Sequence, residues 1–555
     1  MTLAGCRKLG HVAVIGAGMT GLKAIKELRA AGIKVTAFEL SNDIGGIWRF
    51  TEEESLSSVY RSTRINTIRA TNAFGDFPVP EDRGYQVNMT HQDMMGYFRD
   101  YAKEFNLLEN IRFETRVTRV EPCEDSGKNG TSWRLRFHGP DNKAEEGVFD
   151  GVVICSGHHS TPHMPSFKGM ESFPGKLMHS HSYKDNTPFE GKRCVVVGIG
   201  NSGSDIVTEV SKVAKETILV ARRGTWMVKN SLHDPNANAV SRLEQNVLGR
   251  LPKHVGADLA EEGLADSRAK LEKAGLAPTF RFNEGHPTIT GNCADNDFLK
   301  QLDAGKISGR RGIEHFDGST VHFTDGSQVE ADAVIMCTGY EIGYPFLDSD
   351  VLEVRPDRHL DLYKYMFPVG PREVHNIAFV GVVQQIGAMS MICDVQSRVV
   401  ARYMAGELAL PSRQKMKQDI EAKRAFNAEW YYDAPRHSVE VSVRPYLDEI
   451  GEMISATPTF WRILLRAPWL LGLVYSTPTC GGHYRLVGYG ADVKRARYNM
   501  TKEYNVCYGH MANRRSWSGY LEHKLKVYGV LLPMAIFYQL KSLLTTGKTF
   551  FFAWE

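Results

Sequence analysis

Two short glycine-rich segments carry the residue types and the spacing that bind the phosphates of a dinucleotide. The first is GAGMTG at residues 16–21, and the second is GIGNSG at residues 198–203. In such a segment the first glycine allows a tight turn, the second lets the backbone approach a pyrophosphate, and the third lets a helix pack closely on a strand. The alternative for the first segment is a glycine turn without a ligand. Together they predict redox chemistry with two nucleotide cofactors.

Each glycine segment stands where a strand pattern ends and a helix pattern begins. Residues 11–18 are an apolar run, and the helix pattern that follows carries Leu22, Ile25 and Leu28 before it closes at Gly32. The strand pattern KVTAFEL completes one βαβ unit, and RCVVVGIGNSGSDIVTEVSKVAKETILV repeats the same order. The sequence therefore predicts two nucleotide-binding units in one α/β chain.

The first unit has the features of a flavin site. Glu39 ends its second strand, where a carboxylate accepts hydrogen bonds from the ribose hydroxyls of FAD or NAD. A double glycine ending in Gly46 is followed by Ile47 and Trp48, and glycines before a large aromatic side chain favour a flavin over NAD. The alternative is that Trp48 is only a core residue.

The second unit ends its second strand with Arg222 and Arg223 in place of an acid. Guanidinium groups bind a phosphate through paired hydrogen bonds, so these arginines predict the 2′-phosphate of NADPH. A solvated turn is the alternative. The residues expected to contact FAD are Gly16, Ala17, Gly18, Met19, Thr20, Gly21, Glu39, Gly46, Ile47 and Trp48. Those expected to contact NADPH are Gly198, Gly200, Ser202, Gly203, Ser204, Asp205, Arg222 and Arg223.

Composition narrows the choice of electron acceptor. A net charge of +3 over 555 residues gives no support for a nucleic-acid partner. The nine cysteines include no C-x-x-C pair, which disfavours a zinc site and a redox-active dithiol, and they show no iron–sulfur pattern. Asp258, Glu261 and Glu262 are typical of a solvated helix face, so we expect no metal. Molecular oxygen is then the natural acceptor for electrons that pass from NADPH to a flavin.

The segments GAGMTG, GGIWRF, FPGKLMHSHSY, GIGNSGSD and CTGY together resemble the flavin-containing monooxygenases over nearly the whole chain. FPGKLMHSHSY matches the family pattern FxGxxxHxxxY/F, and it ends in Tyr183-Lys184 where Baeyer–Villiger enzymes of the classical type have Trp-Pro. The resemblance implies that NADPH reduces FAD, that O2 then forms a C4a-hydroperoxyflavin, and that this species oxygenates a soft nitrogen or sulfur atom of a small-molecule amine or sulfide. The alternatives are Baeyer–Villiger oxidation of ketones, NADPH oxidation that releases H2O2, and a flavin-binding sensor without turnover.

The same resemblance implies that Asn66 is the catalytic asparagine and that Asn66 and Thr67 contact the cofactors. The surroundings depart from the family pattern, because Ile65 stands where a serine is usual and Arg69-Ala70-Thr71 replaces a Lys-Glu-Met-like run. We interpret His179 of FPGKLMHSHSY as a structural hydrogen-bonding residue where the chain crosses between domains, not as a base. QQIGAMSM at residues 384–391 is expected near the substrate side of the flavin, with a buried turn as the alternative.

We therefore expect two Rossmann-like dinucleotide-binding domains, with the NADPH domain inserted in the FAD domain. The expected ranges are 1–165 and 331–445 for FAD, 166–330 for NADPH with a helical insertion at about 229–297, 446–520 for a C-terminal helical region, and 521–555 for an apolar tail.

Within the tail, the apolar run at residues 527–540 is shorter than the roughly 20 residues of a membrane span. We expect a membrane-associated helix that forms an interfacial or re-entrant anchor and not a single span, with a helix packed on the core as the alternative. The apolar tail resembles the animal microsomal branch of the family, which implies the cytoplasmic face of the endoplasmic reticulum. The sequence leaves open whether the chain forms a homo-oligomer.

Overall fold

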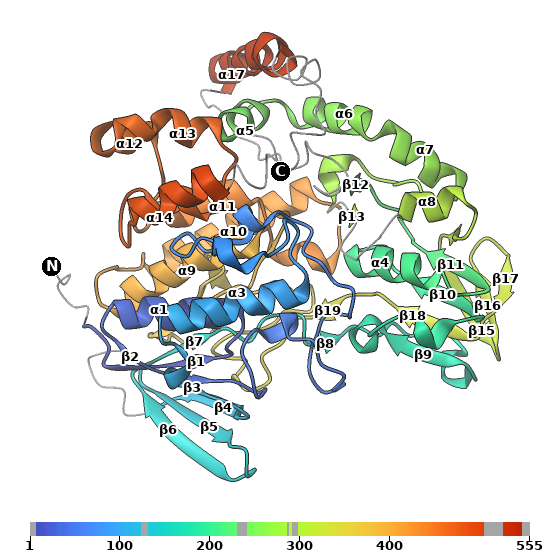
Figure 1. The fold of residues 1–555 in the computed structure, drawn as a ribbon, viewed down its shortest axis with the longest axis horizontal. Helices are drawn as coiled ribbons and strands as arrows, with labels where there is room; N and C mark the ends of the chain where they lie inside the picture. The colour runs from blue at the N-terminus through green and yellow to red at the C-terminus, as the bar shows by residue number, and fades with distance from the viewer. Residues whose placement is uncertain are drawn as a thin grey trace.

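The core of the molecule consists of two five-stranded parallel sheets that lie side by side (Figure 1). The strand order is β22-β7-β1-β2-β3 in the first sheet and β14-β11-β10-β18-β9 in the second. The predicted α/β fold with parallel sheets is therefore confirmed. The computed structural model describes residues 7–123, 131–229, 241–285, 288–290, 298–503 and 525–546.

The two sheets are built on the same plan. The first contains β1 (His11–Ile15), β2 (Lys34–Phe38), β3 (Ile111–Arg112), β7 (Gly151–Ile154) and β22 (Ile377–Phe379). The second contains β9 (Lys176–His179), β10 (Arg193–Val197), β11 (Glu216–Val220), β14 (Ser308–Arg310) and β18 (Ala333–Met336). In both sheets the strand before the glycine turn lies between the strand that follows the helix and a closing strand, β7 or β18. The helices after the turns are α1 (Met19–Ala30) and α4 (Asn201–Val210).

The second sheet lies within the first in chain order, because all of its strands fall between β7 and β22. β18 pairs in parallel with β10, so the second unit extends to Met336, beyond the boundary expected at residue 330. The four buried apolar residues of β18 explain this placement, because they complete the sheet from inside. FPGKLMHSHSY supplies β9, the edge strand next to β18.

Smaller sheets flank the two parallel ones. An antiparallel sheet beside the first, at the lower left of Figure 1, contains β4 (Arg116–Pro122), β5 (Trp133–His138) and β6 (Ala144–Phe149). Its counterpart beside the second contains β15 (Ile313–Asp317), β16 (Thr320–Phe323) and β17 (Gln328–Glu330). The two-stranded pairs are β8 (Thr161–Pro162) with β19 (Tyr340–Glu341), β12 (Met227–Lys229) with β13 (Thr288–Thr290), β20 (Leu362–Tyr363) with β21 (Phe367–Pro368), and β23 (Gln384–Gln385) with β24 (Glu440–Val441).

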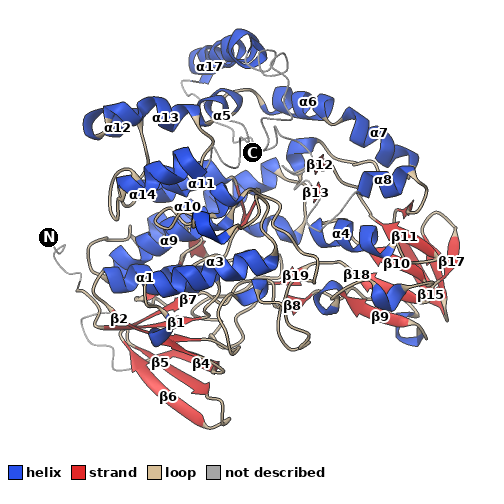
Figure 2. Cartoon of the chain, viewed as in Figure 1, coloured by secondary structure: helices blue, strands red, loops and turns tan. Residues whose placement is uncertain are grey.

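Most helices lie above the two parallel sheets in the view of Figure 2. The helices of the first unit and the C-terminal region are α2 (Arg69–Asn72), α3 (His91–Glu104), α9 (Met389–Met404), α10 (Arg413–Trp430), α11 (Val443–Glu452), α12 (Phe460–Arg466), α13 (Leu471–Ser476) and α14 (Val493–Tyr498). Those of the insertion, the second unit and the tail are α5 (Arg242–Leu248), α6 (Lys253–Gly263), α7 (Ala265–Lys273), α8 (Phe298–Asp303) and α17 (Leu532–Thr546).

The described part of the apolar tail packs on the helical insertion. Leu531 and Ala535 of the tail are buried against Val247 and Leu251. Among the residues that the structure describes, no helix combines the length and the apolar character that a membrane crossing requires.

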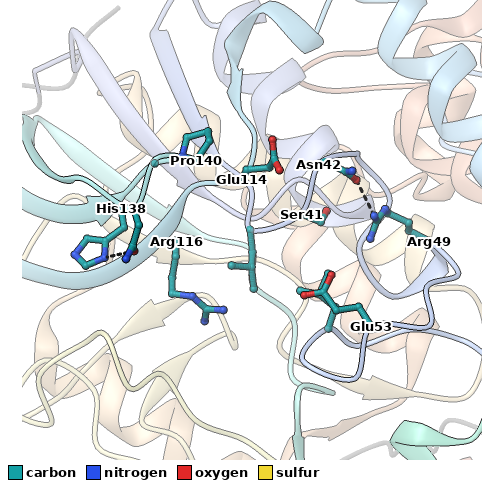
Figure 3. A pocket seen from close by; sticks show the side chains of 12 residues that line it. Ser41, Asn42, Arg49, Glu53, Glu114, Arg116, His138 and Pro140 are labelled. Carbon is teal, nitrogen blue, oxygen red and sulfur yellow. Dashed lines mark hydrogen bonds between the residues drawn. The ribbon is translucent and has the colours of Figure 1, made fainter.

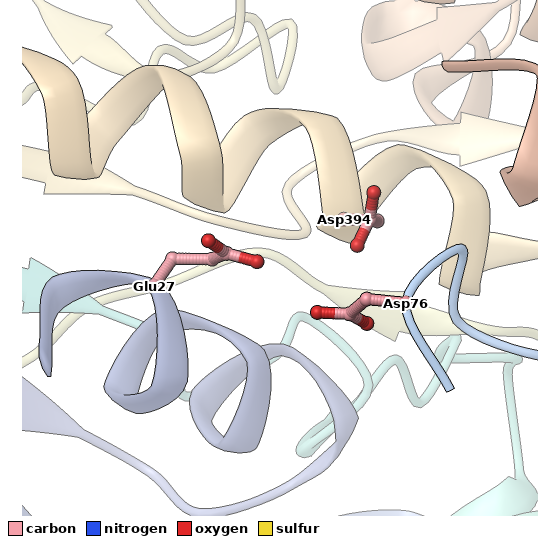
Figure 4. Close-up of side chains that lie close together, drawn as sticks. All are labelled: Glu27, Asp76 and Asp394. Carbon is pink, nitrogen blue, oxygen red and sulfur yellow. The ribbon is translucent and has the colours of Figure 1, made fainter. Parts of the chain in front are cut away.

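A fully buried charge cluster joins segments that are far apart in the sequence. Glu27 on α1, Asp76 after α2 and Asp394 on α9 point toward one another (Figure 4), and one carboxylate oxygen from each lies within 4.8 Å of the others. Lys23 Nζ and Arg485 Nη2, the latter from the short helix η10 (Gly481–Arg485), each lie within 3.3 Å of all three carboxylates. Lys26, at the edge of the cluster, pairs with Glu27 and Asp76 as well. Because three cations already neutralise the three carboxylates, we interpret the cluster as an ion-pair network and not as a metal site.

The network fixes the protonation states of its members. Burial alone would raise the carboxyl pKa values, but Arg485 and Lys23 outweigh burial and hold the pKa of Glu27, Asp76 and Asp394 below their ordinary values. The three groups are therefore carboxylates at neutral pH, and the network ties α1, α9 and η10 together.

We expect Arg485→Met to lower the free energy of unfolding by about 3–5 kcal/mol, because it leaves buried carboxylates without their partner. Arg99→Met is the matched control. Arg99 pairs with Asp43 at 2.7 Å where both side chains are partly exposed, so its loss should cost less than about 1 kcal/mol. Urea unfolding of both variants measures the difference, and equal losses would contradict the role of the network.

The network also predicts a pH dependence of stability. The carboxyl pKa values are lower in the folded chain than the unfolded values of about 4. These groups therefore stabilise the fold above that pH, and the stabilisation is lost as the pH falls toward the folded-state values. The melting temperature should fall more steeply between about pH 5 and pH 2 in the unmodified protein than in Arg485→Met. Equal declines of the melting temperature in the unmodified protein and in Arg485→Met would show that other groups control acid unfolding.

Candidate functional site

The first glycine turn can exist only without side chains at two of its positions. Gly16 has a φ of +100°, and a Cβ there would lie 2.6 Å from the carbonyl oxygen of Cys155, just after β7. A Cβ on Gly21 would lie 1.9 Å from the carbonyl oxygen of Gly16. The turn is therefore packed tightly against the closing strand, with the half-buried Gly18, Met19 and Thr20 at the start of α1.

Helix α1 begins without a side-chain cap. Gly18 is its N-cap residue and provides no side-chain hydrogen bond, whereas α3 starts with a capping box made by Thr90 and Asp93. The first N–H groups of an α-helix have no partner within the helix, and they attract anions together with the helix dipole. The start of α1 therefore fits a pyrophosphate.

Glu39 lies directly beside this turn at the end of β2. Its buried carboxylate accepts hydrogen bonds from the N–H of Ala17 at 2.7 Å and from the N–H of Ser41 at 2.9 Å. The carboxylate of Glu39 is thus held next to the fingerprint, where it can accept from ribose hydroxyls.

The double glycine that follows Glu39 packs on the same turn. Gly45 and Gly46 have φ values of +107° and +56°, and a Cβ on Gly46 would lie 3.2 Å from the Cα of Gly18. Ile47 is exposed and Trp48 is half-buried in the short helix η1 (Gly46–Trp48). The structure thus brings the residues predicted for the first cofactor together around one turn.

The second glycine turn repeats this geometry. Gly198 has a φ of +106°, and a Cβ there would lie 2.3 Å from the carbonyl oxygen of Cys337, just after β18. A Cβ on Gly203 would lie 2.0 Å from the carbonyl oxygen of Gly198, whereas one on Gly200 would meet no heavy atom within 4 Å. Gly200 is the N-cap of α4 and again supplies no side-chain cap. Open space above an uncapped helix start fits a second pyrophosphate.

The remaining residues predicted for the second cofactor are distributed around α4. Ser202 is half-buried in the first turn, while Ser204 and Asp205 are fully buried in the helix. Arg222 and Arg223 follow β11 and are exposed. The guanidinium of Arg223 lies 4.4 Å from the ring centroid of Tyr432 and donates to the carbonyl of Asp433 at 3.2 Å. Arg222 has no partner among the described residues.

Asn66 is half-buried in a turn that other asparagines hold in place. The amide of Asn88 donates to the carbonyls of Ile65 at 3.1 Å and Thr67 at 3.3 Å, on either side of Asn66. The amide of Asn72 donates to the Thr67 hydroxyl at 2.6 Å. Within the described part of the chain, the side-chain amide of Asn66 itself has no hydrogen-bond partner, so it is available to a ligand.

The segment that leads to Asn66 contacts both nucleotide-binding units. The N–H of Val59 donates to the carbonyl of Ile47 at 2.9 Å, beside the first glycine turn. The hydroxyl of Tyr60 donates to the carboxylate of Asp205 on α4. Residues 59–66 therefore connect the two cofactor sites.

The segment QQIGAMSM contacts the same region. Gly387 has a φ of +126° and precedes α9, and the hydroxyl of Ser390 donates to the carbonyl of Thr71 at 3.2 Å. The start of α9 thus lies against α2, which follows Asn66 in the chain. Gln385 has a buried side-chain oxygen without a hydrogen-bond partner in the described structure.

His179 ends β9 and is buried at the junction of the two units. Its Nδ1 accepts the N–H of His181 at 3.1 Å, and its ring lies 5.3 Å from that of Tyr340. Burial lowers the pKa of His179 to about 4, so its imidazole is neutral near pH 7. These contacts are those of a residue that orders a turn.

A cavity of about 350 Å³ opens beyond the end of β2 (Figure 3). Its wall includes Leu40 and Ser41, which directly follow Glu39, and Arg116 of β4. Asn42 accepts a hydrogen bond from Arg49 at 2.6 Å on one side of the cavity. The cavity therefore lies between the end of β2 and the antiparallel sheet.

Sequence patterns did not reveal several residues that shape the site. Cys155 and Cys337 place their carbonyl oxygens against the first glycine of each turn, and the repeated Cys-x-Gly after each closing strand is a signal that could have found them. Asn72 and Asn88 leave no such signal, because they act through contacts that only the folded chain forms.

Comparisons with known proteins agree with this geometry. A family model described as flavin-binding monooxygenase-like matches residues 9–541. Flavin-containing monooxygenase 5 of Mus musculus is 35% identical over 504 residues, which cover 89% of this chain and 92% of the mouse protein. Flavin-containing monooxygenase 2 of Homo sapiens is 34% identical over 487 residues, 86% of this chain and 89% of the human protein.

Solved structures show the same fold. The S-allyl-L-cysteine S-oxygenase from Allium sativum matches 89% of this chain and 100% of its own, with a TM-score of 0.62 and 25% identity. A steroid monooxygenase bound to NADP matches 80% of this chain and 96% of its own, with a TM-score of 0.59 and 18% identity, which shows the fold alone. From the family match over nearly its whole length, the chain belongs to the flavin-binding monooxygenase-like family and is a monooxygenase that uses FAD and NADPH.

Proposed function

We propose that this monooxygenase transfers one oxygen atom of O2 to a soft nitrogen or sulfur atom of a small-molecule amine or sulfide. The observation that carries the proposal is segment 59–66, which is bonded to both nucleotide-binding units and ends at Asn66. The similar protein from Allium sativum is named as an S-oxygenase, which supports sulfur as one target atom.

The first unit would hold FAD. The uncapped start of α1 binds the pyrophosphate, and Glu39 accepts from the ribose. The 350 Å³ cavity beyond Leu40 receives the adenine end. When bound and reduced by NADPH, FAD supplies the oxygen-activating chemistry, so the protein contributes binding, orientation and the exclusion of water.

The second unit would hold NADPH. The uncapped start of α4 binds the pyrophosphate, and Gly200 leaves space for the close approach of the backbone. Arg222 and Arg223 bind the 2′-phosphate. Because Arg223 is already engaged with Tyr432 and Asp433, Arg222 supplies most of the phosphate contact.

Asn66 supplies an amide that both donates and accepts hydrogen bonds between the two cofactor sites. Asn88 fixes the backbone on either side of it, so the amide is presented in one orientation. A soft nucleophile needs no protein base to accept an oxygen atom. The role of Asn66 is therefore to bind and orient, and we assign no proton-transfer step to it.

A membrane surface is a further part of this proposal. α17 exposes Phe537, Leu540 and Leu544, and α12 with the turn after it exposes Trp461 and Trp469. All of these elements lie along the upper side of the molecule in Figure 1. Apolar and Trp side chains on one side favour the interface of a membrane, in line with the cytoplasmic face of the endoplasmic reticulum.

Flotation with phospholipid vesicles tests the proposed membrane binding, and we expect the protein to rise with the vesicles. A protein that stays at the bottom of the gradient would contradict it.

Arg222→Gln should raise the KM for NADPH by about tenfold or more, because it removes a charge-assisted contact to the 2′-phosphate. The KM for NADH, which lacks that phosphate, should stay nearly unchanged. Arg281→Gln is the matched control, since Arg281 is a partly exposed arginine of the insertion that pairs with Asp258 and Glu261. Steady-state kinetics with both coenzymes measure the effect, and equal changes for NADPH and NADH would refute the assignment.

Asn66→Ala should reduce the yield of sulfoxide per NADPH consumed by about tenfold or more, because the amide at the reaction site is lost. The FAD content should be unchanged, since the contacts of the first glycine turn are intact. Asn110→Ala is the control, because Asn110 is a half-buried asparagine before β3 whose amide contacts only the carbonyl of Val35. The assay follows NADPH, sulfoxide and H2O2 with a thioether substrate. Unchanged sulfoxidation in Asn66→Ala would count against the role of Asn66.

A further inference from the structure

We propose that Tyr60 is a positioning residue that couples the occupation of the NADP site to the placement of Asn66. The inference rests on the function proposed above and adds a residue that links the two nucleotide-binding units. Tyr60 belongs to the first unit by sequence, since it lies between Trp48 and Asn66, but its side chain is bound to the second unit.

The side chain of Tyr60 is anchored on the nucleotide-binding helix α4. Its hydroxyl donates to the carboxylate of Asp205, which is fully buried two residues after Gly203. Its ring packs against the hydrophobic core of the second unit, with its centroid 5.8 Å from that of Tyr183. A hydrogen bond to a buried carboxylate is among the stronger ones in proteins, so this contact holds the segment firmly to α4.

The backbone after Tyr60 is held at nearly every second residue up to Asn66. The N–H of Thr63 donates to the carbonyl of Tyr60 at 3.0 Å, and the carbonyl of Thr63 accepts from His91 at 3.1 Å. The N–H of Ile65 donates to the carbonyl of Met89 at 2.9 Å. These contacts make residues 60–66 a strap of fixed shape, so a displacement of the Tyr60 side chain is carried to Asn66.

The nucleotide would bind at the start of the same helix that carries Asp205. A helix of ten residues, Asn201–Val210, moves as one body, so its N-terminus and Asp205 cannot shift independently. NADP bound at Gly200 therefore orders α4. Because the Tyr60 hydroxyl is hydrogen-bonded to Asp205 on this helix, the strap becomes more ordered as well. The contact of Val59 with Ile47, directly before the strap, joins the same segment to the first unit and does not depend on NADP.

The chain offers a matched comparison on the same helix. The hydroxyl of Tyr183 donates to the carboxylate of Glu209 at 2.8 Å, four residues after Asp205 on α4. Tyr183 comes from FPGKLMHSHSY and not from the strap. Tyr60→Phe and Tyr183→Phe thus each remove one hydroxyl that bonds a carboxylate of α4, but only Tyr60 belongs to the strap that ends at Asn66.

The first experiment measures coupling in the FAD-loaded enzyme with NADPH and a thioether. Tyr60→Phe should raise the share of NADPH electrons released as H2O2 by about tenfold, while Tyr183→Phe should leave it near that of the unmodified enzyme. Equal uncoupling in Tyr60→Phe and Tyr183→Phe would overturn the inference, since it would show a general effect of loosening α4.

The second experiment does not depend on turnover. Hydrogen–deuterium exchange of peptides covering residues 59–67 is measured with and without NADP⁺. NADP⁺ should slow exchange in the unmodified protein and in Tyr183→Phe, but not in Tyr60→Phe. Protection by NADP⁺ that persists in Tyr60→Phe would overturn the inference, whatever the enzyme oxygenates. If the unmodified enzyme forms no sulfoxide but shows NADP⁺ protection that Tyr60→Phe loses, the proposed substrate class fails and the coupling role of Tyr60 stands.

Discussion

Three buried carboxylates shared between two buried cations fix the elements on which both ends of the active site depend. Helix α1 carries the first glycine turn at its start, and α9 begins within residues 384–391, which contact the segment after Asn66. Arg485 ties the C-terminal region to both helices. The cost of burying these charges means that the network adds little net stability compared with an apolar core. The network instead specifies how the helices are arranged, because any other arrangement would leave a charge without a partner.

The two nucleotide-binding units share the same local architecture. In both, a cysteine carbonyl at the end of the closing strand presses on the first glycine, and an uncapped helix starts above it. The units differ at the end of the second strand, where Glu39 is buried beside the turn and Arg222 is exposed. In the proposed function, this difference lets the first unit bind a ribose with free hydroxyls and the second a ribose that carries a phosphate. The proposed strap from Tyr60 to Asn66 would join the two sites.

The elements of both units could be predicted from the sequence, because glycine spacing and apolar strand patterns are local signals. The ion-pair network could not. Lys23 and Glu27 are one helical turn apart and have the pattern of an exposed surface pair, and only the packing of α9 and η10 over them makes them buried. FPGKLMHSHSY marked the crossing between domains, but its role as the edge strand β9 follows from pairing with β18, more than 150 residues away. The assignment of Asn66 rests on family resemblance and stays a prediction, because a single asparagine in a loop has no periodic signal.

The central claim is that electrons from NADPH and one atom of O2 meet a soft nucleophile at the site that Asn66 completes. Turnover with NADPH, a thioether and ¹⁸O2 in unlabelled water tests it most directly by mass spectrometry of the product. The account predicts a sulfoxide that carries one ¹⁸O atom for nearly every NADPH consumed. A product without label, or label found only in released H2O2, would contradict it.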